Sequence, residues 1–358
     1  GQRAALGLSP HLEELGFKIF RLKTGTPARV KAGSIDFSKG EVQLGTDKEL
    51  SFSYQTDKFV PLKDQHPCYL IHTTDETKKI IEDNLLESAM YSGNVKGRGP
   101  RYCPSIEDKI VRFNDKERHQ LFLEPESAET DSIYIQGFST SMPTDIQEKM
   151  VHSLPGLENA EFICYAYAIE YDAIVPTQLK LSLETKLVEN LFTAGQINGT
   201  SGYEEAAGQG LMAGINAVRK IQGKDPLVLK RNESYIGLMI DDLVTKGTNE
   251  PYRLLTSRSE YRLLLRHDNA DLRLRQYGYD VGLLRQEVYD SYIKKVNDIE
   301  KLKELLQTTK VSKEDGLNEY VKEKGYEDNV VGMLLSDLIK RPFIMLRLSN
   351  WYAFIWFD

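Results

Sequence analysis

The sequence has few cysteines and no metal-binding pattern. Cys68, Cys103 and Cys164 are the three cysteines among 358 residues. An odd number without metal-type spacing argues against a disulfide framework and against a zinc site, so we expect thiols and no metal centre. Cys68 and Cys164 lie in apolar, strand-like runs, where a small hydrophobic residue is the expected role.

Long apolar runs and targeting signals are also missing. No stretch approaches the roughly 20 consecutive apolar residues that a membrane-spanning helix needs. The first residues, GQRAALGLSPHLEELGF, lack the basic start, apolar core and small-residue cleavage site of a secretory signal. We therefore expect a cytoplasmic protein that does not associate with membranes. The net charge of -7 means that any RNA contact must come from a local basic patch.

The patterns along the chain predict an α/β fold in two or three domains. FKIFRL, from Phe17 to Leu22, alternates like a strand and follows a short helical stretch. Residues 28–175 mix β-rich runs such as CYLIHTT, SIYIQGF and FICYAYAIEY with helical stretches near 76–90 and 143–153. This mixture predicts an α+β lobe.

The second half of the chain changes character twice. After Pro176, the runs LKLSL and NLFTAG predict strands that lead into a glycine-rich turn and a helix over about 204–220, as in a nucleotide-binding α/β sheet. From Asn232 onward, segments such as EVYDSYIKKVNDIEKLKELLQTT have helical periodicity with charged outer faces. They predict a C-terminal helical domain.

The glycine-rich turn is the first candidate site. It reads GQINGTSGYEEAAGQG, from Gly195 to Gly210. Glycines let the backbone approach a ligand, and the helix that begins near Tyr203 offers unpaired N–H groups and a positive dipole end worth roughly 0.3–1 kcal/mol. The alternative is a tight turn under a closely packed helix. Gly208-x-Gly210-x-x-Ala213 lies inside the helix, so we reject it as a dinucleotide fingerprint, which must lie between strand and helix.

The second candidate site surrounds Cys103. It reads GPRYCPSIEDKIVRF over residues 99–113, and several cations lie close to the thiol in sequence. Positive charge stabilises a thiolate, which is the reactive form of a nucleophilic cysteine. A structural thiol remains the alternative.

Arginines are interleaved with tyrosines in PYRLLTSRSEYRLLLRHDNADLRL, which begins at Pro251. Arg258, Arg262 and Arg266 recur every four residues, so we expect them on one face of a helix that could follow RNA phosphates. A solvated face neutralised by nearby carboxylates is the alternative. Lys23 and Arg29 flank the turn from Thr24 to Pro27 and form a weaker candidate anion site.

These motifs together resemble the tRNA uridine 5-carboxymethylaminomethyl modification enzymes, the GidA/MnmG flavoproteins. The resemblance rests on the segments 99–113 and 195–210, supported by RLKTGTPARV and the arginine-rich segment, and covers about residues 10–340. It implies that 1–27 and 176–228 are parts of a doubly wound FAD-binding domain, that 28–175 is an inserted NAD- and substrate-binding lobe, and that 229–358 is a helical domain for tRNA and partner binding.

The resemblance also implies the roles of individual residues. Gln196 matches the FAD contact, with Gly195, Gly199, Thr200 and Gly202 shaping its turn. Cys103 is similar to one of two catalytic cysteines, which acts by covalent addition to uracil or by proton transfer. The segment assigned to NAD comprises Gly99, Pro100, Arg101, Tyr102, Cys103, Pro104, Ser105, Ile106, Glu107, Asp108, Lys109, Ile110, Val111, Arg112 and Phe113.

The implied reaction is FAD-dependent transfer of a one-carbon unit from methylene-tetrahydrofolate to carbon five of the wobble uridine, with NADH as reductant and glycine or ammonia as amine donor. The implied partners are tRNA, a second copy of the chain and a tRNA-modification GTPase in a heterotetramer.

The sequence also departs from the family pattern. The family's N-terminal FAD fingerprint, its other catalytic cysteine and its far C-terminal region have no counterpart here, and the aromatic tail IMLRLSNWYAFIWFD is unlike the family. We therefore expect the full protein to be an enzyme and this chain to be a fragment of it, whose own activity the sequence leaves open. The alternatives are the related folate-dependent tRNA uracil methyltransferase and a non-catalytic tRNA-binding or dimerisation module.

Overall fold

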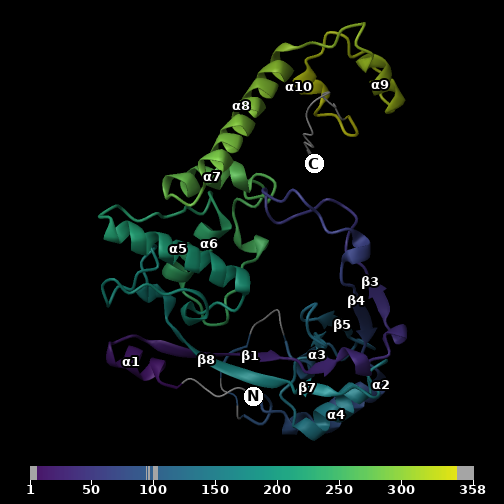
Figure 1. Cartoon of the computed structure of the whole chain (residues 1–358), viewed down its shortest axis with the longest axis vertical. Helices are drawn as coiled ribbons and strands as arrows, with labels where there is room; N and C mark the ends of the chain where they lie inside the picture. Colours follow the sequence, from purple (N-terminus) through teal and green to yellow (C-terminus); the bar gives the residue numbers. More distant parts are fainter. Residues whose placement is uncertain (1–5, 94, 96, 100–103, 345–358) are drawn as a thin grey trace. The chain divides into compact units, whose positions relative to one another are not determined.

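The computed structural model describes residues 6–93, 95, 97–99 and 104–344. The chain divides into two compact units, Gly1–Arg266 and His267–Asp358. Both helices and strands are present, which agrees with the predicted α/β class (Figure 1).

A six-stranded sheet organises one part of the first unit. Its strand order is β3-β4-β5-β6-β2-β7, and neighbouring strands pair antiparallel. Leu123 lies opposite Ile135, and both are buried because alternate residues of a strand face the same side of the sheet. The strands are β2 (Arg29–Lys31), β3 (Glu41–Gln43), β4 (Cys68–His72), β5 (Gln120–Pro125), β6 (Ser132–Gln136) and β7 (Phe162–Cys164).

Three helices pack on this sheet: α2 (Asp75–Asp83), α3 (Ile106–Arg112) and α4 (Thr144–His152). They contribute Ile81, Ile106 and Met150, none of which is more than 2 % exposed, to one core with the sheet residues. Thr74 begins α2 with a capping box, in which its hydroxyl accepts a hydrogen bond from the backbone of Thr77. This region therefore combines an antiparallel sheet with helices in one core.

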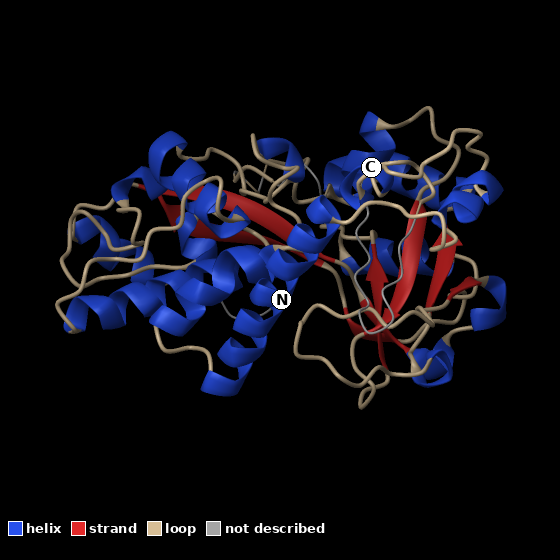
Figure 2. Cartoon of the chain, turned by 90° about the horizontal axis from the view of Figure 1, so that it is seen from above, coloured by secondary structure: helices blue, strands red, loops and turns tan. Residues whose placement is uncertain are grey.

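A long two-stranded ladder runs beside the sheet, and both appear in red in Figure 2. Strand β1 (Ile19–Thr26) pairs antiparallel with β8 (Tyr167–Ile174), from Ile19 opposite Ile174 to Thr26 opposite Tyr167. The ladder joins residues that are 141 to 155 positions apart in sequence, and the residues after Thr26 lead directly into β2.

A second core surrounds helix α5 (Tyr203–Ile221). Met212 and Ala213 of this helix pack with Leu12 of α1 (Leu8–Glu14) and Ile240 of α6 (Tyr235–Asp241). A π-helical turn, Asp242–Lys246, continues α6. The predicted helix after the glycine-rich turn is confirmed.

The strands predicted at LKLSL and NLFTAG are wrong. Within residues 179–194 the structure has only the isolated bridges Leu179–Thr185 and Glu184–Phe192. Leu183 and Asn190 have φ angles of 66° and 67°, a left-handed conformation that interrupts an extended strand. Among the described residues, all multi-residue ladders are antiparallel.

The helix predicted for Arg258 to Arg266 is also wrong. A 3₁₀ turn occupies Thr256–Arg258, and irregular turns follow to Arg266. Serine and threonine hydroxyls here favour local turns over helix, and three arginines on one face would repel one another.

The second unit is helical. It contains α7 (Ala270–Asp280), α8 (Gln286–Thr308), α9 (Leu317–Glu323) and α10 (Leu335–Leu338). Val311, Val321, Val330 and Leu338 form its core. Over the residues that the structure describes, no helix combines the length and apolar character needed to cross a bilayer.

Candidate functional site

A cavity of about 250 Å³ lies at the C-terminal end of β1 and the start of α3. It brings together two motifs separated by about 75 residues of sequence, the end of β1 and the segment around Cys103. The turn predicted from Thr24 to Pro27 is wrong, because Thr24, Gly25 and Thr26 pair with β8 as the last residues of β1. The described residues that line it are Lys23, Thr24, Gly25, Met90, Gly99, Pro104, Ser105, Asp108, Arg112, Ser139 and Glu250.

Close backbone packing fixes one wall of this cavity. The backbone N–H of Lys23 donates to the carbonyl oxygen of Arg98 at 2.8 Å, and Leu22 forms an isolated parallel bridge with Arg98. Gly97 fits against this bridge, since a Cβ there would lie 2.7 Å from the backbone of Leu22. The segment before Cys103 is therefore fastened to β1.

A buried carboxylate fixes the opposite wall. Glu107 of α3 is 0 % exposed, and its Oε1 accepts hydrogen bonds from Ser88 Oγ at 3.0 Å, Thr140 Oγ1 at 2.8 Å and the Ser141 backbone at 3.1 Å. Ser105 caps α3 by accepting from the Asp108 backbone at 3.2 Å. These contacts hold the face of α3 that carries Asp108 and Arg112 toward the cavity.

Asp108 is the carboxylate of α3 that lines the cavity. Tyr91 donates a hydrogen bond to its Oδ1 at 3.1 Å, and Arg112 approaches the same oxygen at 3.9 Å. Burial, together with the neighbouring Asp108 carboxylate, raises the pKa of Tyr91 to about 12, so the phenol stays protonated and remains a donor. The site thus combines a fixed acceptor with nearby cations.

Residues of the predicted NAD segment take different positions. Gly99, Pro104, Ser105, Asp108 and Arg112 line the cavity. Ile106, Glu107 and Ile110 are buried in the lobe, Lys109 donates to the carbonyl oxygen of Gly137 at 2.8 Å, and Val111 and Phe113 are exposed. Pro100, Arg101, Tyr102 and the predicted catalytic Cys103 lie outside the described residues. Cys68 is half-buried and Cys164 is exposed.

The glycine-rich turn is built around the buried amide of Gln209. Its Oε1 accepts from the Gly195 backbone at 3.1 Å and from Asn198 Nδ2 at 2.9 Å, while its Nε2 donates to Thr200 Oγ1 at 3.1 Å. Gly199 has a φ of 83°, and a Cβ there would lie 3.0 Å from Thr248. Gln209 therefore holds Gly195 and Thr200, both predicted cofactor-site residues, from one point on α5.

The outer side of the turn is open. Gln196 is exposed, and the N-cap of α5 is Gly202, which has no side chain to accept from the first-turn N–H groups. Glu204 and Glu205 both lie in this first turn. These two carboxylates would repel a phosphate. The N-terminus of α5 is therefore better suited to binding an uncharged carbonyl oxygen than an anion.

The turn is also bonded to the arginine-rich segment. Tyr252 donates its backbone N–H to the Gly199 carbonyl at 2.8 Å. Glu205, which is 3 % exposed, accepts from Arg253 Nε at 3.1 Å and from the Leu254 backbone at 2.8 Å. Hydrogen bonds between described residues therefore connect the predicted FAD turn to Tyr252, Arg253 and Leu254, which directly precede the segment with Arg258.

A buried ionic cluster around Asp242 anchors Tyr252, at the start of the arginine-rich segment. Asp242 accepts from Arg231 at 2.7 Å, from Lys246 at 2.8 Å and from Tyr252 OH at 3.0 Å. Burial alone would raise the pKa of Asp242, but these three hydrogen bonds outweigh it and hold that pKa below its usual value. Arg231 also binds Glu260, which ties the start of the irregular segment to α6.

The predicted RNA-binding cations are not gathered at one place on a helix. Lys23 lines the cavity. Arg29 binds Glu126 at 3.2 Å and stacks on Tyr134, and Arg258 stacks on Tyr252 at 4.4 Å from the ring centre. Arg262 is exposed, and the exposed Arg266 donates to the Leu263 carbonyl.

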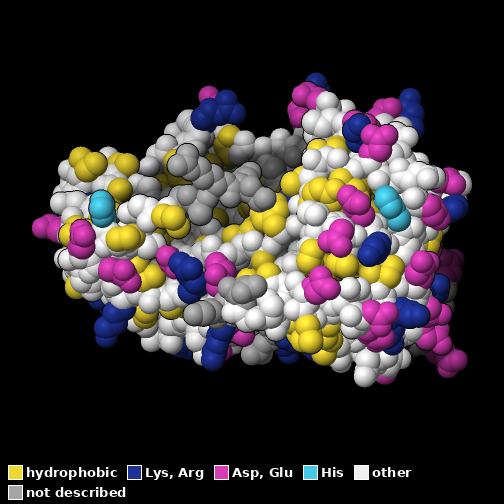
Figure 3. Space-filling view, turned by 90° about the horizontal axis from the view of Figure 1, so that it is seen from below, with side chains coloured by type: hydrophobic (Ala, Val, Ile, Leu, Met, Phe, Trp, Pro, Cys, Tyr) yellow, Lys and Arg dark blue, Asp and Glu magenta, His cyan; other side chains and the backbone are white. Residues whose placement is uncertain are grey.

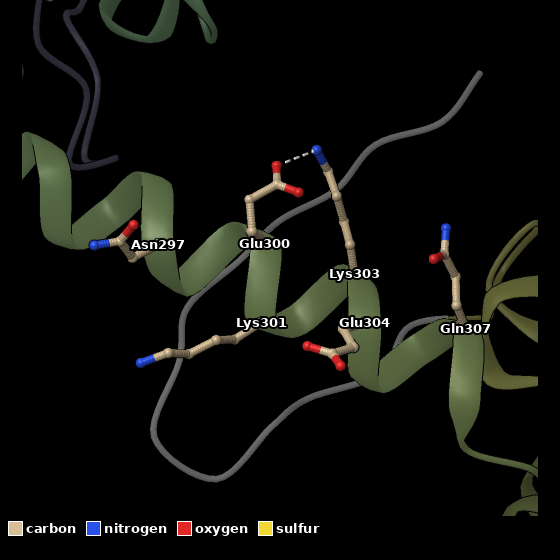
Figure 4. A pocket seen from close by; sticks show the side chains of 6 residues that line it. All are labelled: Asn297, Glu300, Lys301, Lys303, Glu304 and Gln307. Carbon is tan, nitrogen blue, oxygen red and sulfur yellow. Dashed lines mark hydrogen bonds and ion pairs between the residues drawn. The ribbon is translucent and has the colours of Figure 1, made fainter.

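One face of the molecule and a hollow beside α8 offer no clear alternative site. On the face shown in Figure 3, acidic and basic side chains are interspersed, so neither charge forms a continuous field there. A hollow of about 520 Å³ adjoins α8, where Figure 4 shows Glu300 and Lys303 paired at 2.7 Å. The described residues that line it all come from this one helix and are polar, which is typical of a solvated helix face.

Sequence reasoning missed several residues that shape these sites. Met90, Ser139 and Glu250 line the cavity but come from distant loops, so no local pattern indicated them. Glu205 and Gln209 did have a signal, because they are four residues apart and share a helix face with Met212. Polar residues on the apolar face of a helix are candidates for buried anchors.

Comparisons with known proteins match this chain to one family. The sequence model for "Glucose inhibited division protein A" matches residues 1–225. The "tRNA uridine 5-carboxymethylaminomethyl modification enzyme MnmG" of Geobacillus thermodenitrificans is 58 % identical over 341 residues, which cover 95 % of this chain and 54 % of that protein. The Bacillus cereus protein of the same name gives the same identity and coverage.

A solved structure gives the same result. The crystal structure of Aquifex aeolicus GidA superposes with a TM-score of 0.81 and 50 % identity, over 91 % of this chain and 57 % of that one. The chain therefore spans about half the length of the curated relatives that it matches.

Proposed function

Because this chain belongs to the glucose inhibited division protein A family, we propose that its protein modifies carbon five of the wobble uridine of tRNA in an FAD-dependent reaction. The product carries a carboxymethylaminomethyl or aminomethyl group. The observation that carries the proposal is the cavity, because it unites β1 with the Cys103 segment in a protein 58 % identical to a named tRNA uridine modification enzyme.

The glycine-rich turn fits part of a flavin site. Gly195 and Gly199 adopt left-handed φ angles of 83°, which brings backbone rather than side chain to the surface of the turn. The uncapped N-terminus of α5 would donate N–H groups to a ring carbonyl, and Gln196 is exposed beside it. FAD, when bound, supplies the redox chemistry for transfer of the one-carbon unit from methylene-tetrahydrofolate, with NADH as reductant.

The residues of the cavity would bind and orient the reacting ring. Lys23 and Arg112 supply positive charge, and Asp108 supplies an acceptor held by Tyr91. Cys103 directly precedes the cavity-lining Pro104 in sequence, and its proposed role is addition to the uracil ring or proton transfer.

Further assignments complete the proposal. Residues 1–27 and 176–228 belong to the FAD-binding domain, 28–175 to the NAD and substrate lobe, and 229–358 to the region for tRNA and partner binding. The protein acts in the cytoplasm as a homodimer with a tRNA-modification GTPase. The exposed cations Arg262 and Arg266, together with the half-buried Arg258, support a role in RNA binding.

Flavin retention and RNA preference together test this function. The purified chain is incubated with FAD, freed of unbound flavin and examined by visible absorption. Its binding to an anticodon stem-loop with uridine at the wobble position is compared with the same stem-loop carrying cytidine. We expect retained flavin bands and tighter binding of the uridine stem-loop. A colourless protein with equal affinity for both stem-loops would contradict the proposal.

A further inference from the structure

We infer that Asp108 and Lys23 form a recognition pair for one edge of a planar ring, an edge that carries an N–H group next to a carbonyl oxygen. Uracil has this edge, and so does the carboxamide of nicotinamide. The inference rests on the proposed function, since both rings occur among its ligands. It assigns the ring-reading role to two residues that line the same cavity from different elements, α3 and β1.

Among the described residues, Asp108 has one carboxylate oxygen engaged and one without a hydrogen bond. Tyr91 and Arg112 both approach Oδ1, at 3.1 Å and 3.9 Å. Among the described residues, no hydrogen bond reaches Oδ2. The side chain is 22 % exposed, so the free oxygen belongs to a partly desolvated group. A carboxylate of this kind accepts an N–H donor more strongly than one in open water does.

Lys23 presents the complementary group. Its aliphatic stem packs over Gly99, where a Cβ would lie 3.1 Å from Lys23 Cε. This packing restricts the side chain of Lys23, which lines the cavity. No described residue forms an ion pair or hydrogen bond with Lys23 Nζ. The ammonium is a donor only, so it requires an acceptor such as a ring carbonyl.

The two groups together define a chemical pattern. An ionised carboxylate only accepts hydrogen bonds and an ammonium only donates them, so the pair matches an adjacent donor and acceptor on one ligand edge. A methyl group on the ring nitrogen, or a carboxylate in place of the carboxamide, removes the donor and leaves Asp108 facing a group that it repels.

The size of the cavity favours a single ring. Its volume of about 250 Å³ is below the roughly 300–1,000 Å³ of pockets that enclose drug-sized ligands. Met90 offers an apolar contact for a ring face, and Ser105 and Ser139 offer hydroxyls. A whole dinucleotide does not fit this volume, so the ring alone would enter while the rest of the ligand lies outside.

Ligand analogues test the pair directly on the wild-type chain. The binding of uridine monophosphate and 3-methyluridine monophosphate is measured by calorimetry, alongside nicotinamide mononucleotide and nicotinic acid mononucleotide. We expect at least one parent compound to bind, and its donor-lacking analogue to bind at least tenfold more weakly, because a lost hydrogen bond to a charged group costs this much or more. The pair of compounds that discriminates identifies the ring as uracil or nicotinamide.

Three variants separate recognition from folding. Asp108→Ala should reduce the discrimination between parent and analogue to about onefold, because it removes the carboxylate and leaves space for the methyl group. Lys23→Met keeps the packing on Gly99 and should weaken the parent compound about tenfold. Asp145→Ala is the matched control, a first-turn carboxylate of α4 that does not line the cavity, and should change neither value.

The outcomes of these measurements are distinct from those of the flavin and stem-loop tests. Binding without discrimination, or no binding of any of the four compounds, would overturn the recognition pair. Discrimination that survives Asp108→Ala would overturn the role of Asp108, and the wild-type comparison holds even if that variant unfolds. A chain that discriminates the analogues but prefers no stem-loop and retains no flavin keeps its recognition pair and contradicts the proposed function.

Discussion

Helix α5 and the segment from Thr256 to Arg266 are both rich in polar residues, but they hold them in opposite ways. In α5, Glu205, Gln209 and Asn216 are buried and bonded to loops on either side. In the segment 256–266, Ser259 and Leu265 are the buried residues, and the arginines face outward or stack on neighbours. The comparison teaches that the buried polar residues of α5 fix backbone positions, whereas the segment 256–266 carries cations on the surface of the molecule.

The largest effect should come from breaking the buried set. Gln209→Leu removes an amide that serves the Gly195 backbone, Asn198 and Thr200, and leaves buried polar groups without partners. We expect a loss of about 2–4 kcal/mol in the free energy of unfolding, since each unsatisfied buried group costs about 1–3 kcal/mol. Urea denaturation followed by circular dichroism measures this loss.

The same turn provides the matched control. Gln196→Leu changes the same residue type at an exposed position, and should alter stability by less than about 0.5 kcal/mol. If both substitutions had equal effects, the buried amide would not be the anchor of the turn. If Gln196→Leu lost flavin retention without losing stability, Gln196 would be a flavin contact and Gln209 the structural anchor of the turn.

These two regions also show what the sequence reveals and what it conceals. The glycine-rich turn and α5 were predictable, because glycines, a following run of helix-forming residues and the 3.6-residue period all indicate the same local structure. The strand before the turn was not, since the apolar runs at 179–194 are bent by left-handed residues Leu183 and Asn190 that carry no glycine signal.

The helix predicted for Arg258 to Arg266 was wrong for a different reason. A four-residue spacing predicts a helix only if the intervening residues tolerate one, and here Arg231 and Glu205 bind neighbouring backbone and carboxylate groups in an irregular path. The cavity could be predicted only in part. Its two motifs were evident, but the pairing of β1 with β8 and the loop positions of Met90 and Ser139 depend on tertiary contacts.

Acid should destabilise the protein by an intermediate amount through an ion pair at the C-terminal end of α5. Glu184 is bound by Lys180 and by Lys220 of α5, and these hydrogen bonds lower the pKa of Glu184 to about 2. A depressed folded-state pKa stabilises the protein above the unfolded value near 4.5 and loses this contribution as the pH falls toward 2. After allowance for solvent screening, we expect Glu184 to contribute about 1 kcal/mol at neutral pH.

Glu184→Gln tests this assignment. The variant should be less stable than the wild type at pH 7, and the difference should shrink between pH 4.5 and 2 as the wild-type carboxylate takes up its proton. Urea midpoints across this range give the comparison. Glu189→Gln is the control, because its side chain is 78 % exposed and its ion pair with Lys220 is longer, at 3.4 Å. A constant difference at all pH values would contradict an ionic role for Glu184.

The smallest effect on stability is expected from substituting an exposed arginine of the segment 256–266. The same substitution should change the salt dependence of RNA binding. Arg262→Ala should change the free energy of unfolding by less than about 0.5 kcal/mol. If Arg262 contacts a phosphate, the slope of log affinity for an anticodon stem-loop against log salt should fall by about 0.7–0.9. Arg118→Ala, an exposed arginine of the six-stranded lobe, should leave the slope unchanged. An unchanged slope in Arg262→Ala would mean that this part of the segment is a solvated surface, and RNA binding would then depend on the stacked Arg258 or on cations elsewhere.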